Sequence, residues 1–172
     1  HGLVASSKAT FQFPEITLGI LPGIGGLIIP FRKWPKGAAK FTAMLCRNDR
    51  LSAKDALELG VVSALEDDYW KLVQLAADRA RALSGAMPTD QPSGLAAADI
   101  PEQEATQMDG TPLSAQACGI ILDAVRAGVQ EADLGAALET GYRAFGKIAE
   151  GPAAKEGIGA FLGKRKPDFS RM

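Results

Sequence analysis

The chain has 172 residues, of which 47% are hydrophobic and 23% charged. That composition can bury a core and argues against global disorder. Its 19 basic and 20 acidic residues give a formal net charge of −1, which argues against nucleic acid as the main partner. No apolar run approaches the roughly 18 residues of a membrane span, and two cysteines are too few for a secreted disulfide framework. We therefore expect a cytoplasmic protein with no membrane span.

The first predicted region, residues 1 to 66, combines short strands with short helices. Polar and aromatic residues alternate over residues 10 to 13 before Pro14, which predicts a strand that ends there. Prolines and glycines then indicate a turn. The elements predicted after this turn are helices over residues 36 to 46 and 53 to 59, and a second strand over residues 61 to 65.

The second half of the chain is predicted to be helical apart from one long interruption. Residues 67 to 87 contain an amphipathic helix, with apolar positions three and four residues apart between 68 and 84. Residues 88 to 111 have no sustained period, which predicts a flexible insertion. Residues 112 to 172 form a helical C-terminal region, with helices predicted over residues 113 to 126, 133 to 149 and 158 to 162.

Two short strands cannot support these helices alone, because an isolated pair of strands is only marginally stable in water. The helices nevertheless have wide apolar faces that need cover. We therefore expect a mostly helical portion of a larger α/β unit, or a subunit that completes its core against partners.

Four segments, in a fixed order, resemble a known family. They are PEI at residues 14 to 16, LGILPGIGG at 18 to 26, LSAKDALELGVV at 51 to 62 and AKEGIGAFLGKRKPDF at 154 to 169. Together they resemble the crotonase family of enoyl-CoA hydratases and isomerases. The resemblance implies an α/β fold of the crotonase spiral type, of which this chain would be the C-terminal part. It also implies a trimer or a dimer of trimers, with residues 112 to 172 as the trimerisation region.

By this resemblance, Glu15 is the catalytic general acid/base. The family's enzymes polarise an acyl-CoA thioester with two peptide N–H groups, the oxyanion hole, and form an enolate. Those donors, and a second acidic residue used by hydratases, would come from an upstream segment absent from this sequence. Phe13 and Ile16 make an apolar setting that suits a proton-transferring carboxyl group. A solvent-facing turn carboxylate is the alternative interpretation.

The resemblance also assigns substrate-binding residues. Pro22, Gly23 and Gly25 would lie against the acyl pocket, although their spacing matches neither a dinucleotide fingerprint nor a phosphate-binding loop. The alternative is a tight turn with a helix packed behind it. Where the family has a polar run after the glycines, residues 27 to 32 are mainly apolar. The resemblance therefore does not specify which acyl group the substrate carries.

Phe161 and Lys164 would bind the adenine ring and phosphates of coenzyme A in a neighbouring subunit, and a solvated basic tail is the alternative. Coenzyme A is then part of the substrate, and no separate cofactor or metal is expected. With a single histidine in the chain, histidine triads and multi-histidine metal sites are not expected. Cys46 and Cys118 lie in apolar helical stretches and are expected to be core thiols.

The predicted activity is hydration or isomerisation of an enoyl-CoA through Glu15. The alternatives are another crotonase-type reaction, namely thioester hydrolysis or ring C–C cleavage, and a non-catalytic acyl-CoA-binding or assembly subunit.

Overall fold

A computed structural model describes residues 3–83, 85, 92–170 and 172. They form two compact units, each built from two stretches of the chain. Unit 1 takes in His1–Phe11 and Arg50–Asp90, and unit 2 takes in Gln12–Asp49 and Gln91–Met172. Each unit therefore depends on contacts between segments that are far apart in the sequence.

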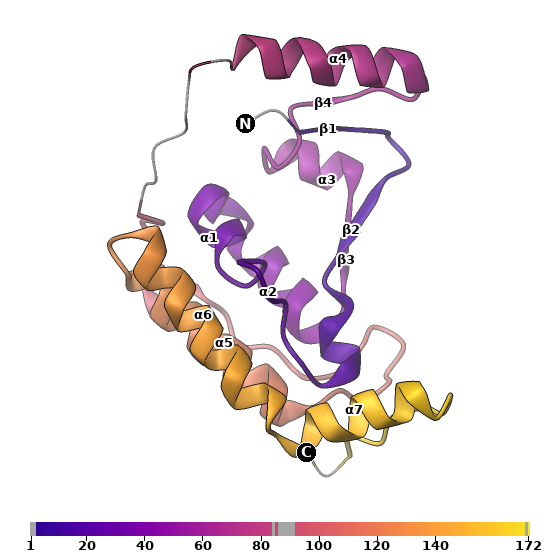
Figure 1. The fold of residues 1–172 in the computed structure, drawn as a ribbon, viewed down its shortest axis with the longest axis vertical. Coiled ribbons are helices and arrows are strands. Elements are labelled where there is room, and N and C mark those ends of the chain that lie inside the picture. Colours follow the sequence, from indigo (N-terminus) through magenta and orange to yellow (C-terminus); the bar gives the residue numbers. More distant parts are fainter. Residues whose placement is uncertain (1–2, 84, 86–91, 171) are drawn as a thin grey trace. The chain divides into compact units, whose positions relative to one another are not determined.

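Unit 1 combines short strands with helices (Figure 1). Strand β1, Val4–Ala5, pairs in parallel with β4, Ala64–Leu65, so that Val4 lies opposite Ala64. Strand β3, Arg50–Ser52, leads directly into helix α3, Ala53–Glu58. The Ser52 hydroxyl accepts a hydrogen bond from Asp55 N at 3.1 Å, so it caps α3.

The strands are more numerous and shorter than predicted. The first predicted strand corresponds to β2, Thr10–Gln12. Of the second, predicted over residues 61 to 65, only Ala64–Leu65 form a strand, β4. The prediction of two strands was wrong, because β1 and β3 are also present and two two-stranded sheets form, β1-β4 and β2-β3. Strands of two or three residues are too short to show the alternation that identifies a strand in a sequence.

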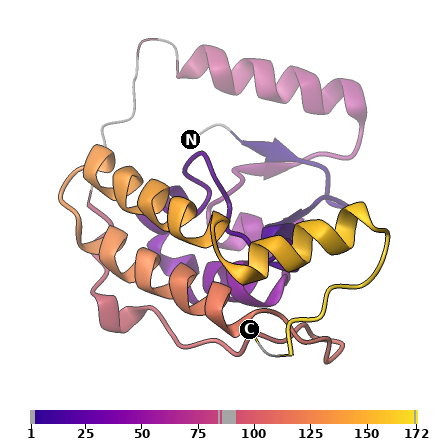
Figure 2. The same cartoon turned by 60° about the horizontal axis from the view of Figure 1, so that its bottom comes forward.

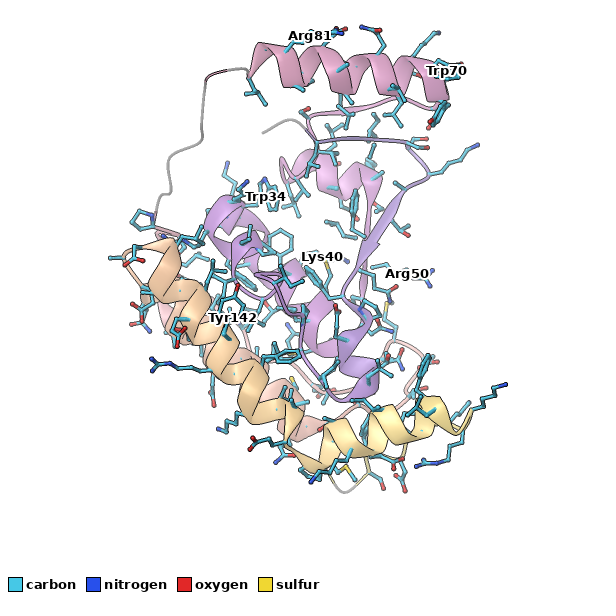
Figure 3. All side chains as sticks on the ribbon, in the orientation of Figure 1. Trp34, Lys40, Arg50, Trp70, Arg81 and Tyr142 are labelled. Atoms are coloured by element: carbon cyan, nitrogen blue, oxygen red, sulfur yellow. The ribbon has the colours of Figure 1, made fainter. Side chains whose placement is uncertain are left out.

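Helix α4, Tyr69–Ala82, occupies the predicted amphipathic segment but buries none of its residues. It lies along β1, which is only two residues long and covers little of the helix. Trp70, labelled in Figure 3, is 75% exposed and its ring meets Tyr69 edge to face. The apolar period thus correctly predicted the helix, while its apolar face is only partly covered within unit 1.

Unit 2 is mainly helical. Figures 1 and 2 show α5 and α6 side by side, with α7 following α6. Its helices are α1, Ile29–Lys33; α2, Ala38–Arg47; α5, Ala115–Gln130; α6, Leu134–Ala149; and α7, Pro152–Leu162. Ser114 and Asp133 cap α5 and α6 by accepting from the backbone N–H groups of Ala117 and Ala136. Of the described helices, none is both long and apolar enough to cross a bilayer.

The segment predicted as a flexible insertion is anchored to unit 2 at two buried residues where it is described. Residues 88 to 91 lie outside the described residues, and the only regular element over 92 to 111 is a 3₁₀ turn, η3, Ala97–Asp99. Ile100 is 2% exposed, and the Ser93 hydroxyl donates to the Val129 carbonyl at 2.7 Å. The segment therefore contributes to the core of unit 2, and its mobility stays a prediction.

Candidate active site

Glu15 lies on a short 3₁₀ helix in unit 2, η1, Pro14–Leu18. Pro14 occupies the first turn, where its fixed φ is compatible with a helix start. Ile16 is fully buried and anchors the turn. Gly19 ends it in the left-handed region at φ 66°, and its N–H donates to the Ile16 carbonyl at 3.0 Å. The sequence thus fixes the backbone on both sides of Glu15.

The Glu15 carboxyl group has one buried oxygen without a partner. The side chain as a whole is half-buried, but Oε2 is buried and has no hydrogen bond within the described part of the chain. Leaving such an oxygen unpaired costs free energy, typically 1–3 kcal/mol. The carboxyl group is therefore not fully exposed to solvent, and the role of Glu15 stays a prediction.

Helix α7 holds η1 in place through its smallest residues. A Cβ atom on Gly157 would lie 2.7 Å from Leu18 Cα and closer still to the Leu18 carbonyl. A Cβ atom on Gly19 would lie 3.0 Å from the Cβ of Ala153. Ala154 and Ala160 on the same helix are buried. The backbone of η1 is therefore in direct contact with α7, an approach that only glycine allows at these two positions.

The turn that follows η1 carries the residues assigned to the acyl pocket. Pro22 and Gly25 are buried and Gly23 is exposed. Gly25 has φ +83°, and a Cβ there would lie 2.7 Å from Ile29 Cδ1. Ile24, at the tip, is 93% exposed at φ 52°, which is unusual for a β-branched residue. The interpretation as a tight turn with a helix packed behind it is confirmed, since α1 begins at Ile29.

A small hollow of about 10 Å³ lies beside this turn. Its walls include Pro22, Gly23 and Gly25 from the turn, and Leu138 and Tyr142 from α6. Tyr142 is labelled on α6 in Figure 3. The hollow brings together three of the predicted substrate-binding residues on a largely apolar surface.

The apolar run after the glycines serves the core of unit 2. Leu27 and Ile28 are buried. Ile28 packs against Gly128 of α5, where an added Cβ would lie 2.5 Å from Ile28 Cδ1. Arg32 is also buried, and its guanidinium donates to the carbonyl of Glu131 at 2.9 Å, in the connection between α5 and α6. The departure from the family's polar run therefore has a packing explanation.

Phe161 and Lys164 lie at the carboxyl end of α7. Phe161 is 70% exposed, and Lys164 is exposed at φ 51° with its N–H donating to the Phe161 carbonyl. Within the described residues, no hydrogen bond or ion pair joins either side chain to Glu15. Arg165 is engaged differently: its guanidinium pairs with Glu156 at 2.8 Å. That pair, with the N–H of Asp168, lowers the pKa of Glu156 to about 2.

Comparison with known proteins identifies the family. Residues 3–92 match the sequence profile described as enoyl-CoA hydratase/isomerase. That range covers more than half of the chain and includes Glu15 and the glycine turn. The chain belongs to the enoyl-CoA hydratase/isomerase family.

Curated relatives extend the similarity along the chain. A probable enoyl-CoA hydratase of Bacillus subtilis is 29% identical over 171 residues, which cover 98% of this chain and 54% of the relative. The 2,3-dehydroadipyl-CoA hydratase of Escherichia coli is 31% identical over 167 residues, covering 97% and 53%. The chain thus spans about half the length of these curated relatives.

Solved structures confirm the fold. A carnitinyl-CoA hydratase from Mycobacterium avium is 20% identical with a TM-score of 0.58, and the match covers 98% of this chain and 54% of that one. An enoyl-CoA hydratase/isomerase from Pseudoalteromonas atlantica T6c is 22% identical with a TM-score of 0.57, covering 98% and 56%. The predicted α/β, mostly helical fold of the crotonase type is confirmed.

In this member of the enoyl-CoA hydratase/isomerase family, Leu138 and Tyr142 line the hollow without having been predicted as site residues. They occur in the apolar period of residues 133 to 149, and a helical period is more often a core face than a binding surface. Only the structure shows that this face of α6 reaches the glycine turn. Sequence spacing alone carried no signal for that contact.

Proposed function

We propose that this chain supplies the acid/base part of the active site of an enoyl-CoA hydratase or isomerase, with Glu15 as the proton-transferring group. The observation that carries the proposal is the buried Oε2 of Glu15, which has no hydrogen-bond partner among the described residues. A carboxyl oxygen held in this way, on an element whose backbone is locked by Gly19 and α7, is positioned for a proton-transfer partner rather than for a structural ion pair.

The chemistry assigns Glu15 one proton. In hydration, water adds its oxygen to the β-carbon of the enoyl thioester, and the protonated Glu15 carboxyl group delivers a proton to the α-carbon of the enolate. The carboxylate is then reprotonated by the proton that water has lost. In isomerisation, the carboxylate takes a proton from one carbon and returns it to another. Either reaction needs peptide N–H donors aimed at the thioester oxygen, which we assign to an upstream segment of the whole protein.

The substrate class follows from the relatives and from the exposed end of α7. The two curated relatives described above are named as a probable enoyl-CoA hydratase and a 2,3-dehydroadipyl-CoA hydratase. We assign coenzyme A to the substrate rather than to a separate cofactor, with Phe161 and Lys164 contacting it across a subunit boundary. Phe161 and Lys164 are both exposed, as such a contact requires, and we propose a trimer or a dimer of trimers as the assembly.

The test is Glu15→Gln in the whole protein, which keeps the shape and one hydrogen-bonding oxygen but removes the transferable proton. We expect kcat for enoyl-CoA hydration to fall by roughly 10²–10⁴ with little change in KM. Glu104→Gln is the control, because Glu104 is exposed and its side chain makes no hydrogen bond or ion pair within the described residues. Wild-type turnover in Glu15→Gln would refute the assignment.

Product analysis separates the remaining possibilities. A hydrated or shifted double bond supports the proposal, whereas release of free coenzyme A or ring cleavage would indicate another reaction of the same family. Binding of an acyl-CoA without any conversion would indicate an assembly or binding subunit. Each outcome is read from the same incubation by chromatography and mass spectrometry.

A further inference from the structure

Two thiols meet in the core of unit 2. Cys46 lies on α2 and Cys118 on α5, and both are reduced and buried, with exposed fractions of 0% and 3%. Seventy-two positions separate them in the sequence. No step of the proposed hydratase chemistry uses either thiol, and a core needs no second cysteine opposite the first.

The Cys46 side chain contacts the backbone of Cys118. Cys46 Sγ lies 3.9 Å from the carbonyl oxygen of Cys118, within hydrogen-bonding range for sulfur, and Cys118 Sγ lies 3.7 Å from the carbonyl oxygen of Gln103. The thiols also hydrogen-bond to one another, which raises the pKa of Cys46 and lowers the pKa of Cys118. Cys118 is also the less deeply buried of the two, and its sulfur lies against Gln103, so an incoming molecule meets it first; its thiolate would be the nucleophilic form.

A short segment covers Cys118. Gln103 belongs to the segment over residues 92 to 111. Arg126 on α5 contacts that segment, because its guanidinium donates to the Ile100 carbonyl at 3.2 Å and to Glu102 at 2.7 Å. Glu102 is largely exposed. A surface ion pair of this kind is weak, typically up to about 1 kcal/mol, so local opening of the segment gives a small molecule a route to Cys118.

We propose that Cys46 and Cys118 form a redox modification site that takes a hydroperoxide, with Cys118 as the attacking sulfur and Cys46 as the resolving thiol. The Cys118 thiolate attacks one peroxide oxygen, the O–O bond breaks, and the released hydroxide takes up a proton as water. Cys46 then attacks the sulfur of the resulting sulfenic acid, the S–O bond breaks, and a second water leaves. Two thiols and one hydrogen peroxide thus give one disulfide and two waters.

The product would join α2 to α5. A cross-link between positions this far apart removes conformations mainly from the unfolded chain, so the oxidised protein should unfold at a higher urea concentration than the reduced protein. α2 also contacts η1, so the cross-link would brace the helix beside Glu15 without involving that residue. The inference stands independently of the proposed hydratase activity.

The experiment treats the folded whole protein with hydrogen peroxide and follows intact mass, with peptide mapping under non-reducing conditions. We expect a loss of two hydrogens, a linked peptide pair containing Cys46 and Cys118, and a higher urea midpoint that returns to its original value with reductant. Cys46→Ser should stop the reaction at a Cys118 sulfenic acid that dimedone traps, whereas Cys118→Ser should leave Cys46 largely unmodified. Oxygen addition without a cross-link in the wild-type protein, or oxidation only after unfolding, would overturn the proposal.

A second pair of variants tests the cover and retains both thiols. Glu102→Ala removes the partner of Arg126 and a negative charge close to the thiols, so we expect disulfide formation to become several-fold faster. Glu104→Ala is the matched control two residues away, in the same segment, and should oxidise at the wild-type rate. Equal rates in the two variants would show that the segment does not control access, and would contradict the proposed route to Cys118.

Discussion

Substituting Gly157 with alanine tests whether α7 positions η1, the short helix that carries Glu15. Gly157 lies in the middle of α7, where its Cα faces the backbone of Leu18 in η1, three residues after Glu15. An added methyl group would have to share space with backbone atoms, which cannot rotate away as a side chain can. The change therefore acts on the position of η1 and removes no polar group.

The size of the effect follows from the contact distance. The new Cβ would lie 2.7 Å from Leu18 Cα, and nonbonded carbon atoms prefer about 3.5–4.0 Å, so η1 and α7 must separate by about 1 Å. A misplacement of that size can cost about 10² in rate. Overpacking typically costs 1–3 kcal/mol, against which alanine gains about 1 kcal/mol of helix propensity over glycine. We expect a net destabilisation of about 0–2 kcal/mol.

Gly159→Ala is the matched control. Gly159 lies on the same helix, and a Cβ there meets no described atom within 4 Å, so alanine should stabilise the protein by about 0.5–1 kcal/mol. Thermal unfolding and steady-state hydration kinetics of both variants provide the measurement. We expect Gly157→Ala to lose about 10² in kcat while Gly159→Ala keeps wild-type kcat. Equal kcat and equal midpoints in the two variants would refute the positioning argument.

Two further predictions concern stability. The folded pKa of Glu156 is about 2, below its ordinary value of 4.5, because Arg165 and Asp168 N donate hydrogen bonds to it. The resulting stabilisation is present above pH 4.5 and is lost as the pH falls towards 2. The difference in unfolding free energy between wild type and Glu156→Gln should therefore shrink between pH 4.5 and pH 2, and a constant difference would contradict this prediction. Ser114 is fully buried and caps α5 by accepting a hydrogen bond from Ala117 N at 3.1 Å. Ser114→Ala should lower the free energy of unfolding, measured in urea, by about 1–2 kcal/mol. An unchanged value would exclude the cap as a stabilising contact.

The helices could be predicted because they are long enough to repeat their apolar period. Residues 133 to 149 were predicted as a helix, and α6 covers Leu134–Ala149. The strands were harder, since β1 and β3 have two and three residues. Packing of the aperiodic segment could not be predicted either, because the burial of Ile100 depends on Arg126, 26 positions along the chain, donating to its carbonyl.

The candidate site residues were predicted from a family resemblance carried by several motifs in a fixed order. Glu15, Pro22, Gly23 and Gly25 were assigned in this way, and the structure brings three of these four to one hollow. Tyr142 could not be found in this way, since a helical apolar period does not distinguish a core residue from the wall of a pocket. The apolar character of residues 27 to 32 was visible in the sequence as a departure from the family's pattern. Its cause, the packing of this run between α5 and α6, is seen only in the structure.

The C-terminal segment shows how one helix can serve two purposes. Residues of α7 that point inward, Ala153, Gly157 and Ala160, are buried and small, so the helix can approach η1 closely. Residues on its other side, Ile158 and Phe161, are exposed. Because a helix turns every 3.6 residues, a single eleven-residue stretch can hold η1 with one face and present aromatic and aliphatic groups with the other. A motif recognised for its exposed aromatic and basic residues therefore also contains the contact that fixes the backbone next to Glu15.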